Sequence, residues 1–127
     1  MNQSDLMQNK RRVIFVVDDE PIIARTLATI LNQAGFEAHA FEAPRKAIAA
    51  CDEMVPDLLI SDVIMPEMTG IEVAIHFRKA QPQCKILLFS GQASTSDLLE
   101  KARAEGYDFE LLTKPVHPAD LLAKLRR

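Results

Sequence analysis

The sequence has few of the features that mark secreted or membrane proteins. Among its 127 residues only two are cysteines, and Cys51 and Cys84 stand apart, without a CxxC pair or a Cys/His cluster. We therefore expect two reduced, packed thiols rather than a disulfide or a metal site. No apolar run approaches the roughly 20 residues that a membrane-spanning helix needs, and no signal-peptide pattern opens the chain. These absences predict a cytoplasmic protein without a membrane partner.

The sequence also has no excess of positive charge. The formal net charge is −3, and the only basic run is Lys10-Arg11-Arg12. Proteins that bind nucleic acid usually concentrate basic residues on one face. The sequence therefore gives no support for a nucleic-acid partner, and we expect the basic run only to solvate the start of the first strand.

The chain divides into a short tail and one domain. Residues 1–12 are polar and aperiodic, which predicts a flexible N-terminal tail. Residues 13–127 contain no internal repeat, low-complexity segment or linker, and they are numerous enough to bury a sizeable core. We therefore expect a single domain over 13–127.

Within that domain, short apolar runs alternate with helical patterns. The apolar runs predict strands at 13–17, 36–42, 57–62, 85–90 and 109–114. The helical patterns run from Pro21 to Gly35, from Pro44 to Met54, after a Thr69–Glu72 capping box, from 94 to 105, and from 117 to the end. Five strands alternating with five helices predict an α/β fold, with a parallel sheet between two helix layers and right-handed crossovers.

Reactive or charged residues follow four of these strands. Asp18 and Asp19 end the first strand, Asp62 the third, Ser90 the fourth and Lys114 the fifth. Open parallel sheets bind ligands beyond the carboxyl ends of their strands. We therefore expect these side chains to converge at one edge of the sheet.

The chemistry of this set indicates phosphoryl transfer. Asp18 or Asp19 together with Asp62 forms a group of hard oxygen ligands, which suits Mg²⁺ and would be strongly self-repelling without a cation. Lys114 supplies an ammonium suited to a phosphate oxygen, and Ser90 a hydroxyl that can turn toward an anion. The combination predicts a phosphoryl group transferred to Asp62.

Four segments of the chain, "VDDEP", "LLISDVIMPEMTG", "ILLFSG" and "LLTKP", resemble the signature segments of response-regulator receiver domains from two-component signalling. The resemblance extends from residue 13 to about 127. It implies a flavodoxin-like, doubly wound sheet of order 2-1-3-4-5. It also implies a phosphoryl donor that is a histidine kinase or a histidine phosphotransfer protein. Since no output domain is visible after the last helix pattern, we expect signalling through a separate protein partner.

The resemblance also implies individual roles for the acidic residues. Asp62 would be the phosphoacceptor, and Asp18 and Asp19 would hold Mg²⁺ together with the backbone carbonyl of Ile64. In this family such a chain is not an enzyme acting on other molecules; it accepts its own phosphoryl group and loses it slowly.

Three further roles follow from the same resemblance. Ser90 would be the switch hydroxyl, Lys114 would contact a phosphoryl oxygen, and Pro115 would follow a cis peptide bond. Family members commonly carry an aromatic residue three positions before the lysine, where this chain has Leu111. We therefore expect the switch to act through Ser90 and Lys114, and Leu111→Ala to cost roughly 2–5 kcal/mol of stability if the side chain is buried.

Two other functions fit parts of the pattern. A small phosphatase could use Asp62 as its nucleophile, but such enzymes usually place a second acid two residues later, where Ile64 stands. A scaffold that is never phosphorylated is the other alternative, and it would normally have lost Asp62 or Lys114. Both residues are present.

Overall fold

The structure is a computed structural model that describes residues 11–91 and 95–126. Its centre is one parallel sheet of order β2-β1-β3-β4-β5, which confirms the predicted topology. The strands are β1 (Val13–Val17), β2 (Glu37–Phe41), β3 (Leu58–Asp62), β4 (Lys85–Ser90) and β5 (Glu110–Thr113). Of the expected tail over 1–12, residues 1–10 lie outside the described residues.

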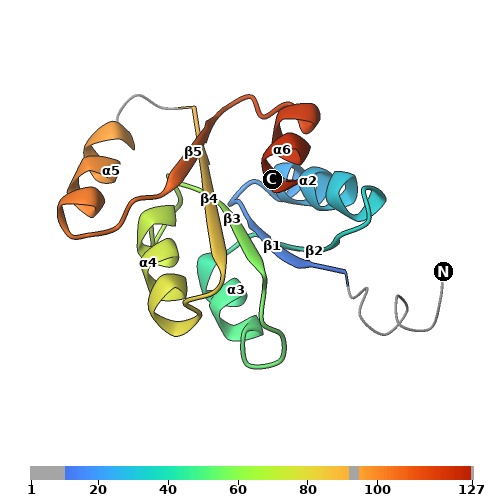
Figure 1. Cartoon of the computed structure of the whole chain (residues 1–127), viewed down its shortest axis with the longest axis horizontal. Coiled ribbons are helices and arrows are strands. Elements are labelled where there is room, and N and C mark those ends of the chain that lie inside the picture. The colour runs from blue at the N-terminus through green and yellow to red at the C-terminus, as the bar shows by residue number, and fades with distance from the viewer. Residues whose placement is uncertain (1–10, 92–94, 127) are drawn as a thin grey trace.

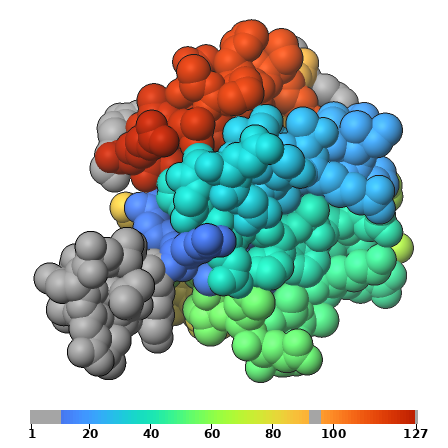
Figure 2. Space-filling model, turned by 90° about the vertical axis from the view of Figure 1, so that its right-hand side faces the viewer, coloured from blue at the N-terminus to red at the C-terminus, as the bar shows by residue number. Residues whose placement is uncertain are grey.

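Helices cover both faces of the sheet (Figure 1). They are α2 (Pro21–Gln33), α3 (Pro44–Ala50), α4 (Gly70–Ala80), α5 (Thr95–Ala104) and α6 (Pro118–Leu125). One face carries α2 and α6, and Figure 2 shows the red and orange C-terminal part lying against the blue and cyan of α2. The other face carries α3, α4 and α5. None of the described helices is long and apolar enough to cross a membrane.

The two helix layers explain why the central strands are almost continuously apolar. Along β1 the side chains alternate between two core clusters, so both faces of the strand are buried. Phe15 packs with Phe77 on the side of α3 and α4, whereas Ile14 packs with Leu31 and Leu121 on the side of α2 and α6. Both cysteines are free and pack in the first of these clusters, as expected for reduced thiols.

Several helix ends follow the sequence signals. The capping box before α4 is present: the Glu72 N–H donates to Thr69 Oγ1, and the Thr69 N–H donates to Glu72 Oε1, both at 3.1 Å. Gly35 follows α2 with φ +102°, and Gly106 follows α5 with φ +96°. Glycine adopts this left-handed conformation without the steric cost of a side chain, so both helices end close to the predicted positions.

The prediction for the second helix was wrong at its end. The expected helix continued to Met54, but α3 ends at Ala50. The N–H groups of Cys51, Asp52 and Glu53 each bond to a carbonyl three residues back, so the chain tightens into turns. Apolar spacing persists through these turns, which is why periodicity alone overestimated the helix.

The fifth strand also ends earlier than predicted. It stops at Thr113, and Lys114 is the first residue beyond it. The Lys114 N–H still donates to Ser90 O at 3.0 Å, but Pro115 has no N–H with which to continue the ladder. Lys114 therefore begins the connection to α6 rather than ending β5.

Candidate functional site

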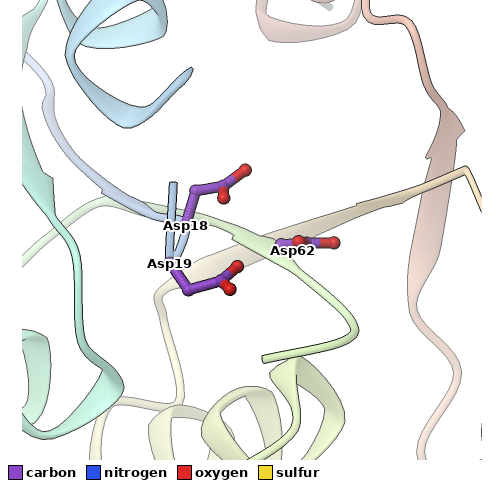
Figure 3. A group of neighbouring side chains, drawn as sticks. All are labelled: Asp18, Asp19 and Asp62. Atoms are coloured by element: carbon purple, nitrogen blue, oxygen red, sulfur yellow. The ribbon is translucent and has the colours of Figure 1, made fainter. Parts of the chain in front are cut away.

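Three aspartates meet where β1 and β3 end. Figure 3 shows the carboxylates of Asp18, Asp19 and Asp62 directed toward the same space. One oxygen of each lies within 4.8 Å of the others. Asp18 is fully buried and Asp62 is 7% exposed, whereas Asp19 is exposed. The structure thus brings together all three acidic residues that the sequence singled out.

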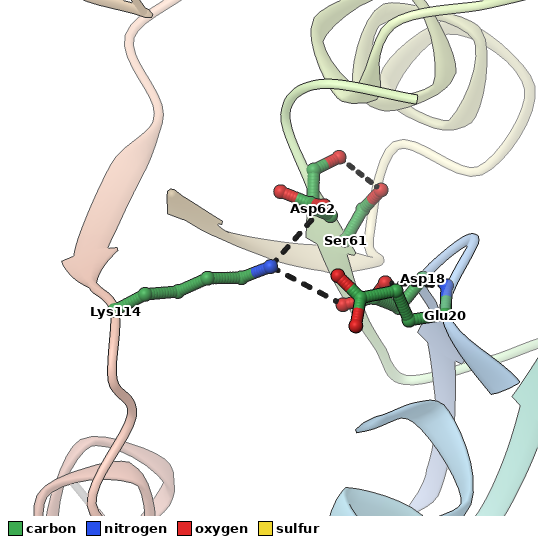
Figure 4. Close-up of polar contacts among 5 residues, drawn as sticks. All are labelled: Asp18, Glu20, Ser61, Asp62 and Lys114. Atoms are coloured by element: carbon green, nitrogen blue, oxygen red, sulfur yellow. Dashed lines mark hydrogen bonds and ion pairs between the residues drawn. The ribbon is translucent and has the colours of Figure 1, made fainter. Parts of the chain in front are cut away.

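Lys114 reaches this cluster from the end of β5. Its Nζ lies 3.3 Å from Asp62 Oδ2 and 3.5 Å from Asp18 Oδ2 (Figure 4). The same Nζ lies 5.0 Å from the ring centroid of the buried Phe89, a favourable cation–π position. Two carboxylates therefore share one ammonium, which lies over the ring of Phe89.

Burial dominates the electrostatics of the cluster. It raises the pKa of Asp18 above its ordinary value, although the Glu20 N–H donates to Asp18 Oδ1 at 2.8 Å and Lys114 also opposes the rise. Burial likewise raises the pKa of Asp62, against the opposing effect of Lys114. For Lys114, burial lowers the pKa, but Asp18 and Asp62 outweigh it and the net shift is upward.

These carboxylates fit a divalent cation. Three carboxylates and one ammonium leave net negative charge in a place where burial disfavours it. The donors are hard oxygens, which Mg²⁺ prefers over nitrogen or sulfur ligands. Asp18, Asp19 and Asp62 are therefore suitable residues to hold Mg²⁺.

A cavity of about 340 Å³ opens beside the cluster. It is lined by Asp19, Glu20, Asp62, Ile64, Ser90, Gly91 and Lys114. Ile64 lines the same cavity, and its backbone slightly opposes the rise that burial causes in the pKa of Asp62. Ser90 is 5% exposed. The peptide bond between Lys114 and Pro115 is cis.

The sequence did not single out every residue of the site. Glu20 was assigned no role in the site from the sequence, yet it lines the cavity and its N–H donates to Asp18 Oδ1. Phe89 was counted only as a strand residue, yet its ring supports the Lys114 ammonium. Their positions directly beside Asp19 and Ser90 were the available signals. Leu111 is 36% exposed, so the condition for a large stability cost there is not met.

A second, apolar groove of about 620 Å³ adjoins this cavity. Its walls include Ile22, Ile23, Ile30, Pro115, Val116 and Pro118. Ile22 is 77% exposed, the highest value among the large apolar side chains described. Lys114 lines both the groove and the acidic cavity, so the two are neighbours on the surface.

Fold and site together define a doubly wound α/β protein with an acidic, lysine-bearing pocket at the carboxyl edge of its sheet. The family model of the response regulator receiver domain matches residues 14–126. The chain belongs to this family.

Individual relatives agree with that assignment. The chain is 31% identical over 116 residues to the chemotaxis protein CheY of Thermotoga maritima, covering 90% of this chain and 94% of CheY. It is 30% identical over 113 residues to the probable transcriptional regulatory protein TcrX of Mycobacterium tuberculosis, covering 89% of this chain. There it spans only 47% of the relative's length.

Solved structures show the same fold. The response regulator TrrA of Thermotoga maritima, in complex with Mg²⁺ and a beryllium fluoride, is 32% identical with a TM-score of 0.76. The match covers 91% of this chain and 96% of TrrA.

Proposed function

We propose that this chain is a phosphoacceptor whose Asp62 takes a phosphoryl group from a phosphorylated histidine. The observation that carries the proposal is the position of Asp62, recessed beside an open cavity and paired with Lys114 at 3.3 Å. An Asp62 oxygen would attack the phosphorus, and the bond from phosphorus to the donor nitrogen would break. The electron pair would stay on the imidazole, which then takes up a proton.

Magnesium belongs to this proposal. Asp18, Asp19, Asp62 and the backbone carbonyl of Ile64 would hold Mg²⁺, which when bound neutralises charge on the phosphoryl oxygens. The complex of TrrA with Mg²⁺ and a beryllium fluoride supports this assignment by similarity. Lys114 would bind a phosphoryl oxygen and keep the negative charge of the site compensated.

The conformational response would start at Ser90 and Lys114. A phosphoryl group offers three acceptor oxygens, and each of these two side chains can donate to one of them. Ser90 ends β4, and Lys114 follows β5, which pairs with β4. Movement of these two residues would therefore reach the connections to α5 and α6, where a partner protein could detect it.

The proposed donor is a histidine kinase or a histidine phosphotransfer protein. A protein donor must dock close to Asp62, and the apolar groove beside Lys114 offers it hydrophobic surface there. The exposed Ile22 is the natural contact. Under this proposal the chain is not an enzyme for other substrates, and its cytoplasmic location stays a prediction.

Labelling with radioactive acetyl phosphate in the presence of Mg²⁺ tests the proposal. The wild type should form a stable acyl phosphate, and Asp62→Asn should form none, since the amide has nearly the same shape but is not nucleophilic. Asp52→Asn makes the same change at an exposed position beyond α3 and should label normally.

The outcomes separate the alternatives. Continuous hydrolysis of acetyl phosphate without accumulation of label would favour a small phosphatase. That function has less support, because the half-buried Ile64 stands where a second acid would be needed. No labelling of the wild type would favour a scaffold that is never phosphorylated. Normal labelling of Asp62→Asn would remove Asp62 from its assigned role.

A further inference from the structure

Two residues that have been given no role so far, Ser61 and Gly70, lie at the backbone carbonyl of Asp62. Ser61, which is fully buried, donates from Oγ to the Asp62 carbonyl oxygen at 2.9 Å (Figure 4). The Gly70 backbone lies close to the same carbonyl. A Cβ added at Gly70 would overlap the Asp62 oxygen and lie 2.9 Å from the Asp62 carbonyl carbon.

Gly70 also closes the loop that follows the acceptor. Its N–H donates to Val63 O at 2.8 Å, while the Val63 N–H donates to Phe89 O at 3.2 Å. The hydrogen bond between Gly70 and Val63 therefore closes the loop of residues 63–69, which leads from β3 into α4. Glu67 in this loop has φ +69°, which is unusual for a residue with a long side chain. Gly70 is the point at which this constrained loop joins α4.

The closure determines where the Ile64 main chain lies. Ile64 lines the acidic cavity together with Asp62, and it lies in the loop that the Gly70 hydrogen bond closes. If Gly70 moved away from Asp62, either the acceptor or this loop would have to shift. Phosphoryl transfer depends on geometry so strongly that a displacement of about 1 Å can cost on the order of 100-fold in rate.

We propose that Gly70 and Ser61 are positioning residues for phosphoryl acceptance. Their contacts hold the backbone carbonyl of Asp62 in place. The Asp62 carboxylate and the Ile64 backbone then keep the relative position that Mg²⁺ and the phosphoryl group require. The inference rests on the proposed function of Asp62. It predicts that Gly70 is needed for the site itself and not only for stability.

Matched glycine variants test the proposal. Gly70→Ala should lower the free energy of unfolding, because the added Cβ meets backbone. Gly35→Ala should also lower it, because an alanine at φ +102° is strained, but nothing lies within 4 Å of the added Cβ. Only Gly70→Ala should lose the rise in melting temperature caused by Mg²⁺, and it should label with acetyl phosphate at least about 10-fold more slowly per folded molecule.

Ser61→Ala is the milder second variant, and it keeps the test valid if Gly70→Ala does not fold. Loss of one hydrogen bond to the Asp62 carbonyl should weaken Mg²⁺ binding and slow labelling by roughly 2- to 10-fold. The proposal fails if Ser61→Ala behaves as wild type, or if a folded Gly70→Ala matches Gly35→Ala in both measurements. A wild type that neither labels nor responds to Mg²⁺ would instead overturn the proposed function.

Discussion

Lys114 partly compensates the negative charge of the carboxylates at the site. Two buried carboxylates share its ammonium at 3.3 and 3.5 Å. A single ammonium cannot neutralise Asp18, Asp19 and Asp62 together, so negative charge remains that a bound cation would offset. The same ammonium would be available to a phosphoryl oxygen, since its distances to both carboxylates are at the long end of hydrogen bonding.

Leu111 occupies the position of the usual aromatic residue, yet it is 36% exposed. We expect Leu111→Ala to lower the free energy of unfolding by less than about 1 kcal/mol, because little apolar surface is lost. Leu88, its direct partner on β4, is fully buried, and Leu88→Ala should cost roughly 2–5 kcal/mol. Urea unfolding of both variants measures the difference. Equal losses would show that Leu111 is packed as tightly as Leu88.

Cys84 gives a prediction for alkaline pH. Burial raises the pKa of its thiol from 9.0 to about 12. The folded protein therefore keeps the proton that the unfolded chain releases, and this contribution to stability is complete below pH 9 and is lost as the pH rises toward 12. The stability difference between wild type and Cys84→Ala should accordingly shrink across that range. A difference that stays constant in urea titrations at pH 8 and pH 11 would contradict the buried thiol.

At the scale of elements, α2 contributes to the protein in two ways. Its inner face packs Ala24, Leu27 and Leu31 into the core, while Ile22 and Ile23 face the groove beside Lys114. A helix that serves only the core would normally be polar at these outer positions. The apolar outer edge therefore supports a docking role for the start of α2.

Ile22→Ser tests this role. The side chain is 77% exposed, so its replacement should change the free energy of unfolding by no more than about 0.5 kcal/mol. Phosphorylation by a histidine kinase that labels the wild type should become slower, whereas labelling by acetyl phosphate should not change. Val55→Ser is the matched control, because Val55 is also exposed, at 56%. It precedes β3 and therefore lies at the amino ends of the strands, away from the site. If both variants slow the kinase equally, the groove has no special role.

At the scale of the whole molecule, the parallel sheet brings together charged side chains from distant segments of the chain. Lys114 is 96 residues from Asp18 and 52 from Asp62 in the sequence, yet it contacts both. Such contacts exist only in the folded chain. Anything that binds the assembled cluster and not the unfolded chain must therefore stabilise the fold.

Mg²⁺ should show this effect directly. At a concentration 100 times its Kd, one bound ion would raise the free energy of unfolding by about 2.7 kcal/mol, which a thermal melt detects as a higher melting temperature. The gain should shrink in Asp18→Ala and in Asp19→Ala, and EDTA should reverse it in the wild type. A melting temperature of the wild type that does not respond to millimolar Mg²⁺ would count against the metal site.

The sequence determined the elements and the residues at their ends. Apolar runs and helical spacing are local properties, so the five strands, the capping box at Thr69 and the polar residues at the ends of four strands could be predicted without a structure. The family resemblance added the strand order and the expectations for Ile64 and Pro115. The ends of α3 and β5 were misplaced, because turn hydrogen bonds and the missing N–H of Pro115 interrupt patterns that continue in the sequence.

Only the tertiary structure decided how these residues meet. The sharing of Lys114, the contact of Gly70 with the Asp62 carbonyl and the groove beside Ile22 all depend on how distant segments pack. The exposure of Leu111 has the same origin, since it depends on what covers the face of β5 rather than on the residue type. Local preference determines which element a segment forms, but distances and burial arise from long-range packing, which no single segment encodes.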